Sequence, residues 1–432
     1  MIGMKEVAAK MKLAAPKLAV SSCEQRNKAL QAVKEALLEN KDAIFAANSK
    51  DMAAAQVNNV APAVMKRLKF NEDKLIDVCN GIEQLIALED PLGKVSLKRE
   101  LDEGLQLFRV SVPIGVIGII FEARPDALVQ ISALCIKSGN CAILKGGKET
   151  VNTNKVLFDI IHRAVVDAGL PEYSLHQATL HNEIDELLAC EKDVDLLIPR
   201  GSNQFVQYIM NNTKIPVMGH ADGVCHIYVD KDADVAKALS IIVDAKIQYT
   251  AACNAVETIL VHRDIADTFL PALAKRLEEV NVSVRGSEDA AEIICKTGIA
   301  CETMQEEEFH TEYLALKASV KLVDSVEQAI SHINYFGSHH TDCIITENNE
   351  NAVIFMEMVD SAGVYRNCST RFADGFRYGF GAEVGISTSK LHARGPVGLE
   401  GMVTYKYKLY GDGHIVDDYA TGKKSFHFKD II

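Results

Sequence analysis

Residues 112–147 read VPIGVIGIIFEARPDALVQISALCIKSGNCAILKGG, and this stretch decides the fold class. The run Val112–Phe121 is apolar without interruption, as expected of a strand buried on both faces of a parallel sheet. A helical stripe follows within Ala127–Lys137, and Gly139 stands just after it, where a positive φ is needed. Ala142–Leu144 is a second short strand. The order strand, helix, strand predicts an α/β protein with a parallel sheet.

The same rhythm continues along the chain. Val194–Pro199 and His226–Val229 are further apolar strands, and a second α/β stretch follows them. The N-terminal part is predicted to form amphipathic helices and then a hairpin that turns at Asp102–Gly104. Late in the chain, VTYKYKLY (403–410) alternates strictly. This pattern predicts a half-buried strand outside the βα rhythm, in an arm that pairs with something else.

Composition limits the classes of protein. The chain has 432 residues, 48% hydrophobic and 24% charged, which fits roughly two or three domains, or one large domain split by insertions, and excludes a disordered or coiled-coil protein. The formal charge of −13 argues against a nucleic-acid surface. Eleven cysteines without a CxxC pair indicate free thiols in a reducing, cytoplasmic location. The N-terminal segment has no apolar h-region and the chain has no apolar run of about 18 residues, so neither a signal peptide nor membrane association is expected.

Three predicted strands end in segments suited to an anionic ligand: Phe121–Asp126, Lys145–Glu149 and Ile198–Ser202. Ligands of open α/β sheets bind at the carboxyl ends of strands, where helix N-termini favour anions. Each segment is also typical of something simpler, namely a surface arginine before a proline-initiated helix, a polar turn or an ordinary helix cap. No strand-GxGxxG-helix fingerprint occurs, so a dinucleotide would be held in another way.

Cys253 is the candidate nucleophile. It lies in QYTAACN (248–254), a small polar loop between a predicted helix and a strand, where a thiolate can be exposed and activated. Most other cysteines are typical of an inert core. No histidine stands out as a base. The run His339–Asp342 has residue types found in metal or dyad sites, but no third ligand follows at a suitable spacing, so no metal is expected.

Longer motifs carry a resemblance over nearly the whole chain. They are VPIGVIGIIFEARPDALV, AILKGGKE, LLIPRGS, GVCHIYVD, CNAVETILV, AISHINYFGSHHTD and the segment from VYRNCSTRFADG to LHARGPVGLEG. Together they resemble the gamma-glutamyl phosphate reductases, a family within the aldehyde dehydrogenase superfamily. The resemblance implies NADPH-dependent reduction of L-glutamyl 5-phosphate to L-glutamate 5-semialdehyde, with release of phosphate, in proline biosynthesis. It also implies a substrate supplied by a glutamate 5-kinase, and a homo-oligomer.

The same resemblance implies an aldehyde-dehydrogenase-like α/β fold, with two Rossmann-like domains built on parallel sheets and a small β arm for oligomerisation. The NADPH-binding domain is expected to comprise residues 1–95 and 113–226, with 377–399 returning to it. The catalytic domain is expected at 227–376, and the oligomerisation arm at 96–112 and 400–432.

Carried over residue by residue, the resemblance implies a cofactor site. Lys145 would hold the adenosine ribose, Lys148 a 2′-phosphate, and Gly201-Ser202 the pyrophosphate. Glu312, before a strand at Val320–Val323, is similar to the glutamate that binds the nicotinamide ribose. The full set expected at the cofactor is Glu122, Ala123, Lys145, Gly146, Gly147, Lys148, Pro199, Arg200, Gly201, Ser202 and Glu312.

For catalysis, the resemblance makes Cys253 the nucleophile that forms a thioester. An ungapped alignment places Arg124 where ordinary aldehyde dehydrogenases have an oxyanion-stabilising asparagine. An arginine suits an acyl phosphate, because its fork grips two phosphate oxygens. Where those enzymes have a general-base glutamate, this chain reads MGHA at 218–221, with no carboxylate; the nearest one, Asp222, is slightly out of register. The expected substrate contacts are Asn254, Asn367, Ser369, Thr370 and Arg371.

Two other functions stay open on the sequence. One is a non-phosphorylating aldehyde dehydrogenase that oxidises a small aldehyde, which a phosphate requirement for aldehyde oxidation would exclude. The other is an inactive structural homologue, against which the intact set of Cys253, Lys145 and Ser202 argues. Residues 367–371 are also typical of a structured turn without a ligand.

Overall fold

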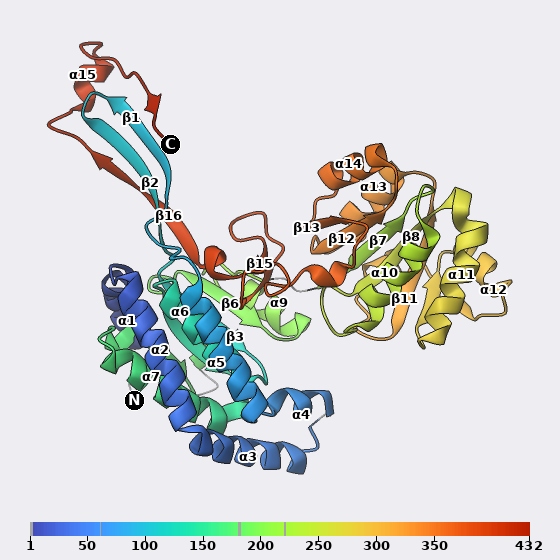
Figure 1. Ribbon diagram of the computed structural model, residues 1–432, viewed down its shortest axis with the longest axis horizontal. Helices are drawn as coiled ribbons and strands as arrows, with labels where there is room; N and C mark the ends of the chain where they lie inside the picture. Colours follow the sequence, from blue (N-terminus) through green and yellow to red (C-terminus); the bar gives the residue numbers. More distant parts are fainter. Residues whose placement is uncertain (1–2, 61, 180–182, 220–221) are drawn as a thin grey trace. The chain divides into compact units, whose positions relative to one another are not determined.

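The computed structural model describes residues 3–60, 62–179, 183–219 and 222–432 (Figure 1). The chain divides into two compact units. Unit 1 comprises Met1–Gly219, Phe380–Gly385 and Val397–Ile432, and unit 2 comprises His220–Gly379 and Ile386–Pro396. Each unit contains a parallel sheet with helices, and unit 1 also carries an antiparallel sheet, so the predicted fold class is confirmed.

Unit 1 combines many helices with two small sheets. Its helices are α1 (Met4–Ala19), α2 (Cys23–Glu39), α3 (Lys41–Val57), α4 (Pro62–Leu68), α5 (Glu72–Ala87), α6 (Pro125–Lys137), α7 (Val151–Asp167), α8 (Glu183–Leu188), α9 (Asn203–Asn211) and α15 (Val416–Ala420). Its strands are β1 (Val95–Asp102), β2 (Leu105–Pro113), β3 (Val116–Phe121), β4 (Cys141–Gly146), β5 (Leu175–Ala178), β6 (Leu196–Arg200), β16 (Val403–Tyr410) and β17 (Lys429–Asp430).

The parallel sheet of unit 1 has the order β5-β4-β3-β6. Every residue of β3 is buried, which confirms the predicted two-sided burial. The strand is shorter than the apolar run, because Gly115 at φ +135° interrupts it and the first residues of the run end β2 instead. Pro125 then starts α6, and Gly139 at φ +71° follows that helix as predicted.

The second sheet of unit 1 is an antiparallel arm with the order β16-β2-β1-β17. β1 and β2 form the predicted hairpin, with Gly104 at φ +75° in the turn. β16 spans 403–410 as predicted and pairs along its whole length with β2. The predicted half-burial of this strand is wrong for the single chain. Only Val403 is buried, because no second layer within the described chain covers either face.

Unit 2 is an α/β structure built on a seven-stranded sheet. Its helices are α10 (Val235–Ile247), α11 (Ala266–Glu279), α12 (Glu288–Cys295), α13 (Val326–Phe336) and α14 (Asn349–Met358). Its main strands are β7 (Cys225–Val229), β8 (Val256–His262), β9 (Ser283–Gly286), β10 (Cys301–Thr303), β11 (Lys317–Val323), β12 (Thr341–Ile345) and β13 (Gly363–Arg366). The short strands β14 (Gly385–Ser387) and β15 (Gly395–Val397) form a separate pair. None of the helices in the described part of the chain has the length and apolar character needed to span a bilayer.

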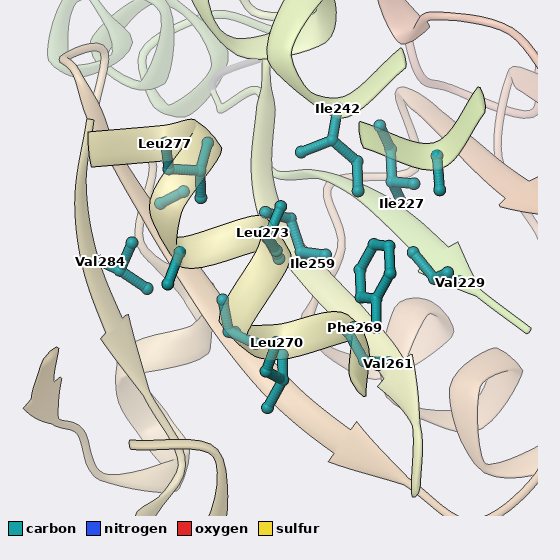
Figure 2. Packing of buried hydrophobic residues seen from close by; sticks show 14 of the residues in the cluster. Ile227, Val229, Ile242, Ile259, Val261, Phe269, Leu270, Leu273, Leu277 and Val284 are labelled. Atoms are coloured by element: carbon teal, nitrogen blue, oxygen red, sulfur yellow. The ribbon is translucent and has the colours of Figure 1, made fainter. Parts of the chain in front are cut away.

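The seven-stranded sheet of unit 2 is parallel and covered on both faces. Its order is β10-β9-β11-β8-β7-β12-β13. Ile227 and Val229 of β7 pack with residues of α10 and α11 on one face (Figure 2). Tyr228, between them in sequence, packs with α13 and α14 on the other. Successive strand residues point to opposite faces, so both faces must be apolar, which is why the strands read as unbroken apolar runs.

The structural units differ in two places from the predicted boundaries. β7 lies within the sheet of unit 2, whereas the sequence assigned residues up to 226 to the first domain. An apolar strand looks the same in either sheet, so the pattern does not reveal which one it joins. Ile386–Pro396 also belongs to unit 2, where Lys390 and Arg394 pair with Asp360, although the sequence assigned 377–399 to the first domain.

His332 of α13 makes the stability of unit 2 sensitive to acid. Its ring lies edge-on to His226 and Phe309, and its Nε2 is buried without a hydrogen-bond partner. Burial lowers its pKa to about 2, with the neighbouring His226 and Lys321 adding to the effect. In the folded chain His332 therefore stays unprotonated at pH values where the same side chain in the unfolded chain, with a pKa of about 6.5, is protonated. Stability from this side chain is present above that pH and is lost as the pH falls toward 2.

We expect His332→Phe to remove part of the acid sensitivity. Between pH 7 and pH 5 the parent should lose about 2 kcal/mol of unfolding free energy through this one group, and the variant should not. Urea unfolding at both pH values measures the difference. His427→Gln, at an exposed histidine, is the control and should keep the full loss. Equal pH dependence in the parent and in His332→Phe would contradict the assignment.

Candidate active site

Cys253 lies in the turn between α10 and β8, as predicted, and is partly exposed. Its Sγ is 3.2 Å from Nε2 of His340. Gly223 stands directly against the backbone of this turn. A Cβ at that position would lie 2.6 Å from the Cβ of Cys253 and closer still to its Cα and carbonyl oxygen. Only glycine therefore leaves Cys253 in its place.

A buried ion pair joins the two ends of the turn. Nζ of Lys246, near the end of α10, donates to the carbonyl of Val256 at 3.0 Å and to Glu257 of β8 at 2.5 Å. Both charged side chains are completely buried. Burial raises the pKa of Glu257 and lowers that of Lys246, while each partner opposes the shift of the other. Because breaking such a pair leaves a buried charge, it fixes where the turn leaves the helix and enters the strand.

His340 immediately precedes β12 and is 1% exposed. Its Nδ1 lies 2.9 Å from Oγ1 of Thr341, so both ring nitrogens face polar atoms. The sequence singled out no histidine as a base, and the structure places a histidine beside Cys253 that this interpretation missed. Only the arrangement of strands in space could have revealed this residue. Cys253, His340 and Gly223 each come just before a strand, and those strands, β8, β12 and β7, are neighbours in one sheet.

Four of the five predicted substrate residues gather at the Cys253 turn. Oγ1 of Thr370 donates to the carbonyl of Asn254 at 2.7 Å, and Nδ2 of Asn254 donates to the carbonyl of Ala373 at 2.7 Å. Oγ of Ser369 accepts from the N–H of Arg371. The loop 369–373 is thus tied to Asn254, the neighbour of Cys253, by two hydrogen bonds from a side chain to a backbone carbonyl.

Arg371 brings a positive charge to this region. Its Nε donates to Gln248 at 2.9 Å, and its side chain is nearly buried. Burial lowers the pKa of the guanidinium, the nearby Arg377 lowers it further, and the Cys253 thiol opposes this. Arg377, which the sequence interpretation did not select, donates from Nη1 to the carbonyl of Arg371 at 2.8 Å. Arg371 is therefore within electrostatic reach of the Cys253 thiol, and its guanidinium is suited to an anionic ligand.

The remaining residues predicted for unit 2 have other contacts. Both polar groups of the Asn367 side chain pair with the backbone of Thr346, so this residue fastens the loop to the end of β12. Its backbone has a φ of +54°, which asparagine tolerates. Glu312 lies in the loop before β11, within electrostatic reach of Lys246 and Glu257.

In unit 1, the three predicted ligand segments meet at one edge of the parallel sheet. Phe121 of β3 lies opposite Gly146 of β4 on one side and opposite Arg200 of β6 on the other. The N–H of Glu122 donates to the carbonyl of Arg200 at 3.1 Å. The predicted cofactor residues of this unit are therefore side by side, although they come from three separate segments: Glu122, Ala123, Lys145–Lys148 and Pro199–Ser202.

Glycines keep the backbone of this edge open. A Cβ at Gly147 would lie 3.1 Å from the backbone nitrogen of Ala123, and one at Gly201 would lie 2.9 Å from Glu122 and from Phe205. Larger residues would fill the space in which a ligand could approach the backbone. The cradle fits a cofactor that carries phosphate groups.

The polar side chains at this edge fit the same ligand. Lys145 is buried, and burial lowers its pKa against the opposing charges of Glu183 and Glu149. Lys148 is exposed at the start of a short 3₁₀ helix. Ser202 is the N-cap of α9, but its hydroxyl makes no capping hydrogen bond. Arg124 is exposed at the N-cap of α6, also without a side-chain capping bond.

Two expectations concern absent groups. The stretch expected to lack a general base ends at His220 and Ala221, which lie outside the described residues. Among the residues that the structure describes, no group of three histidine, cysteine or acidic side chains has the arrangement of a metal site.

Comparisons with known proteins agree with this geometry. The profile of the aldehyde dehydrogenase family matches residues 3–293. The gamma-glutamyl phosphate reductase of Acetivibrio thermocellus is 54% identical over 425 residues, covering 98% of this chain and 97% of the relative. That of Ruminiclostridium cellulolyticum is 53% identical, covering 96% and 95%. The crystal structure of the Thermotoga maritima enzyme matches with a TM-score of 0.92 at 38% identity, covering 96% of this chain and all of that one.

The chain belongs to the gamma-glutamyl phosphate reductase family, a branch of the aldehyde dehydrogenases. The resemblance inferred from the motifs is thereby confirmed. As a member of this family the chain is an oxidoreductase that uses a nicotinamide cofactor. The family position also makes Cys253 and its neighbours the first place to look for the chemistry.

Proposed function

We propose that the chain reduces L-glutamyl 5-phosphate to L-glutamate 5-semialdehyde with NADPH, releasing phosphate, as a step of proline biosynthesis. One observation carries the proposal: Cys253 stands 3.2 Å from a histidine nitrogen and beside Arg371, in a chain 54% identical to a named reductase over 98% of its length. A glutamate 5-kinase would supply the substrate. The reducing, cytoplasmic location expected from the scattered thiols stays a prediction.

The chemistry follows from the side chains. The thiolate of Cys253 attacks the γ-carbonyl carbon, a C–S bond forms, and the bond to the phosphate oxygen breaks. Phosphate is a good leaving group, and Arg371 and Arg124 are suited to its charge because a guanidinium can grip two oxygens. Asn254, Ser369 and Thr370 hold the loop that carries Arg371. The bound cofactor supplies the hydride that reduces the thioester.

This chain's own residues would hold NADPH as follows. Gly146, Gly147 and Gly201 let the backbone approach the phosphates. Ser202 and the N-terminus of α9 would bind the pyrophosphate, Lys145 would bind the adenosine ribose, and Lys148 would bind the 2′-phosphate. Glu312 is proposed to bind the nicotinamide ribose.

Phosphate dependence tests the proposed reaction. In the reverse direction, oxidation of L-glutamate 5-semialdehyde with NADP⁺ should require inorganic phosphate, because phosphate must cleave the thioester. Omitting phosphate should abolish turnover. Oxidation at the same rate without phosphate would indicate a non-phosphorylating aldehyde dehydrogenase and would refute the proposal.

Lys148→Ala should weaken NADPH much more than NADH. A charge-assisted contact to the 2′-phosphate contributes about 1.5–3 kcal/mol, so we expect KM for NADPH to rise by about tenfold or more while KM for NADH stays constant. Steady-state kinetics with both cofactors measure this. Lys155→Ala, at an exposed lysine of α7, is the matched control. Equal effects on NADPH and NADH would remove Lys148 from the 2′-phosphate site.

We also propose that the arm joins copies of this chain into a homo-oligomer. Tyr405, Tyr407 and Leu409 on one face of β16 are each more than half exposed. The strand is also the outer edge of its sheet, and natural proteins seldom leave such an apolar edge uncovered. Tyr407→Asp with Leu409→Asp should give a smaller species by light scattering. The control changes two residues on the opposite face, Lys406→Ala and Lys408→Ala, and should leave the mass unchanged. An unchanged mass in the Tyr407→Asp, Leu409→Asp variant would exclude this interface.

A further inference from the structure

The Cys253–His340 pair has a geometry that the family resemblance did not predict. Sγ and Nε2 are 3.2 Å apart, within the range for a hydrogen bond to sulfur. His340 is 1% exposed, so its ring cannot turn away into solvent. On its other side, Nδ1 is 2.9 Å from Oγ1 of Thr341. A base in line with a nucleophile, held by a third group, is the arrangement that activates nucleophiles in many enzymes.

We propose that His340 is the proton acceptor for the Cys253 thiol. Nδ1 carries the hydrogen and donates it to Oγ1 of Thr341, which leaves the lone pair of Nε2 facing the sulfur. The S–H proton moves to Nε2, and the sulfur keeps the electron pair with which it forms the C–S bond. When the aldehyde leaves and the C–S bond breaks, that pair returns to sulfur and the imidazolium gives the proton back. The proposal rests on Cys253 being the nucleophile of the proposed function.

Two other ionisable groups near the pair, Asp342 and Cys225, are already engaged in hydrogen bonds. Asp342, the second residue of β12, accepts hydrogen bonds from the backbone N–H of His226 and from Oγ of Ser361. Its Oδ1 is also 3.1 Å from Nδ1 of His226. The thiol of Cys225 donates to the carbonyl of Cys253 at 3.3 Å. Neither group is placed to take the proton of the Cys253 thiol.

Three charged side chains on neighbouring elements, Lys246, Glu257 and Arg371, are also unsuited to accept the thiol proton. Lys246 and Glu257 form a buried ion pair with each other. Arg371 donates to Gln248, and a guanidinium accepts no proton at neutral pH. Among the described residues, His340 is thus the base whose nitrogen is shown against the sulfur.

Alkylation of the thiol tests the proposal without substrate. The rate constant for iodoacetamide at Cys253 is measured by peptide mass spectrometry in the full chain, with the exposed Cys295 as internal reference. At pH 7, Cys253 of the parent should react at least about tenfold faster than Cys295, and His340→Gln should remove at least that factor while Cys295 is unchanged. At pH 10 an isolated thiol ionises without a base, so the parent and the variant should converge.

The pH comparison separates proton transfer from a structural role. A rate equally reduced at pH 7 and pH 10 would mean that His340 only shapes the turn, and an unreduced rate at pH 7 would mean that it has no role; either result overturns the proposal. Thr341→Val, a change of one oxygen at a buried position, should slow Cys253 at pH 7 only and supplies a second variant if His340→Gln misfolds. In the parent, a Cys253 no faster than Cys295 at pH 7 also overturns it. The alkylation test uses no acyl phosphate, so it is independent of the proposed function. If alkylation depends on His340 but aldehyde oxidation does not require phosphate, the proposed function is refuted and the role of His340 stands.

Discussion

Cys253→Ala should abolish acyl-phosphate reduction, with a loss of about 10⁴-fold or more in kcat. The reaction has no other route in the proposed chemistry, because both the release of phosphate and the reduction pass through a bond to this sulfur. Cofactor affinity should stay within about twofold of the parent, because the proposed NADPH residues other than Glu312 belong to unit 1. The change removes one atom from a partly exposed turn, so the unfolding transition should shift little.

A matched control and a direct trap make this result specific. Cys295→Ala removes an exposed thiol elsewhere in unit 2 and should keep full activity. Parent enzyme mixed with L-glutamyl 5-phosphate in the absence of NADPH should show one glutamyl adduct, on the peptide that contains Cys253. Turnover by Cys253→Ala, or an adduct on another peptide, would show that the nucleophile is a different group.

Much of the fold could be predicted because burial leaves a periodic trace in the sequence. The apolar run of β3, the stripe of α6 and Gly139 after that helix each follow from a local requirement, and the structure agrees with them. β16 shows the limit of this logic. Alternation along 403–410 reveals which residues share a face, but not whether anything covers that face. Burial of the arm depends on groups beyond the strand itself, which no local pattern records.

The candidate site was predictable only in part, for a related reason. Cys253 stands out by its small polar loop, and the strand ends of unit 1 by their glycines and lysines. His340 was missed because its significance depends on the order of strands in the sheet: β7 lies between β8 and β12. Asn367 illustrates the opposite case. Short amides in loops commonly serve their own backbone, and here the amide pairs with Thr346.

Gly223→Ala should reduce kcat by about 100-fold and leave NADPH binding unchanged. The new methyl group would overlap the backbone of Cys253, so the turn must move by a distance comparable to 1 Å, and misplacing a reacting atom that far costs about 10² in rate. The glycine cannot easily yield instead. The next residue, Val224, is fixed by hydrogen bonds in both directions to Ser338, two residues before His340.

Two measurements distinguish this effect from general damage. Gly81→Ala places the same methyl group in α5, where nothing lies within 4 Å, and should keep full activity while adding up to about 1 kcal/mol of stability through helix propensity. Fluorescence titration of NADPH should give the same Kd in the parent and in Gly223→Ala. Because the displaced turn also separates Sγ from Nε2 of His340, the alkylation rate of Cys253 at pH 7 should fall in parallel with kcat. Full activity in Gly223→Ala would show that the turn tolerates movement, and that the tight contact with Gly223 does not position the nucleophile.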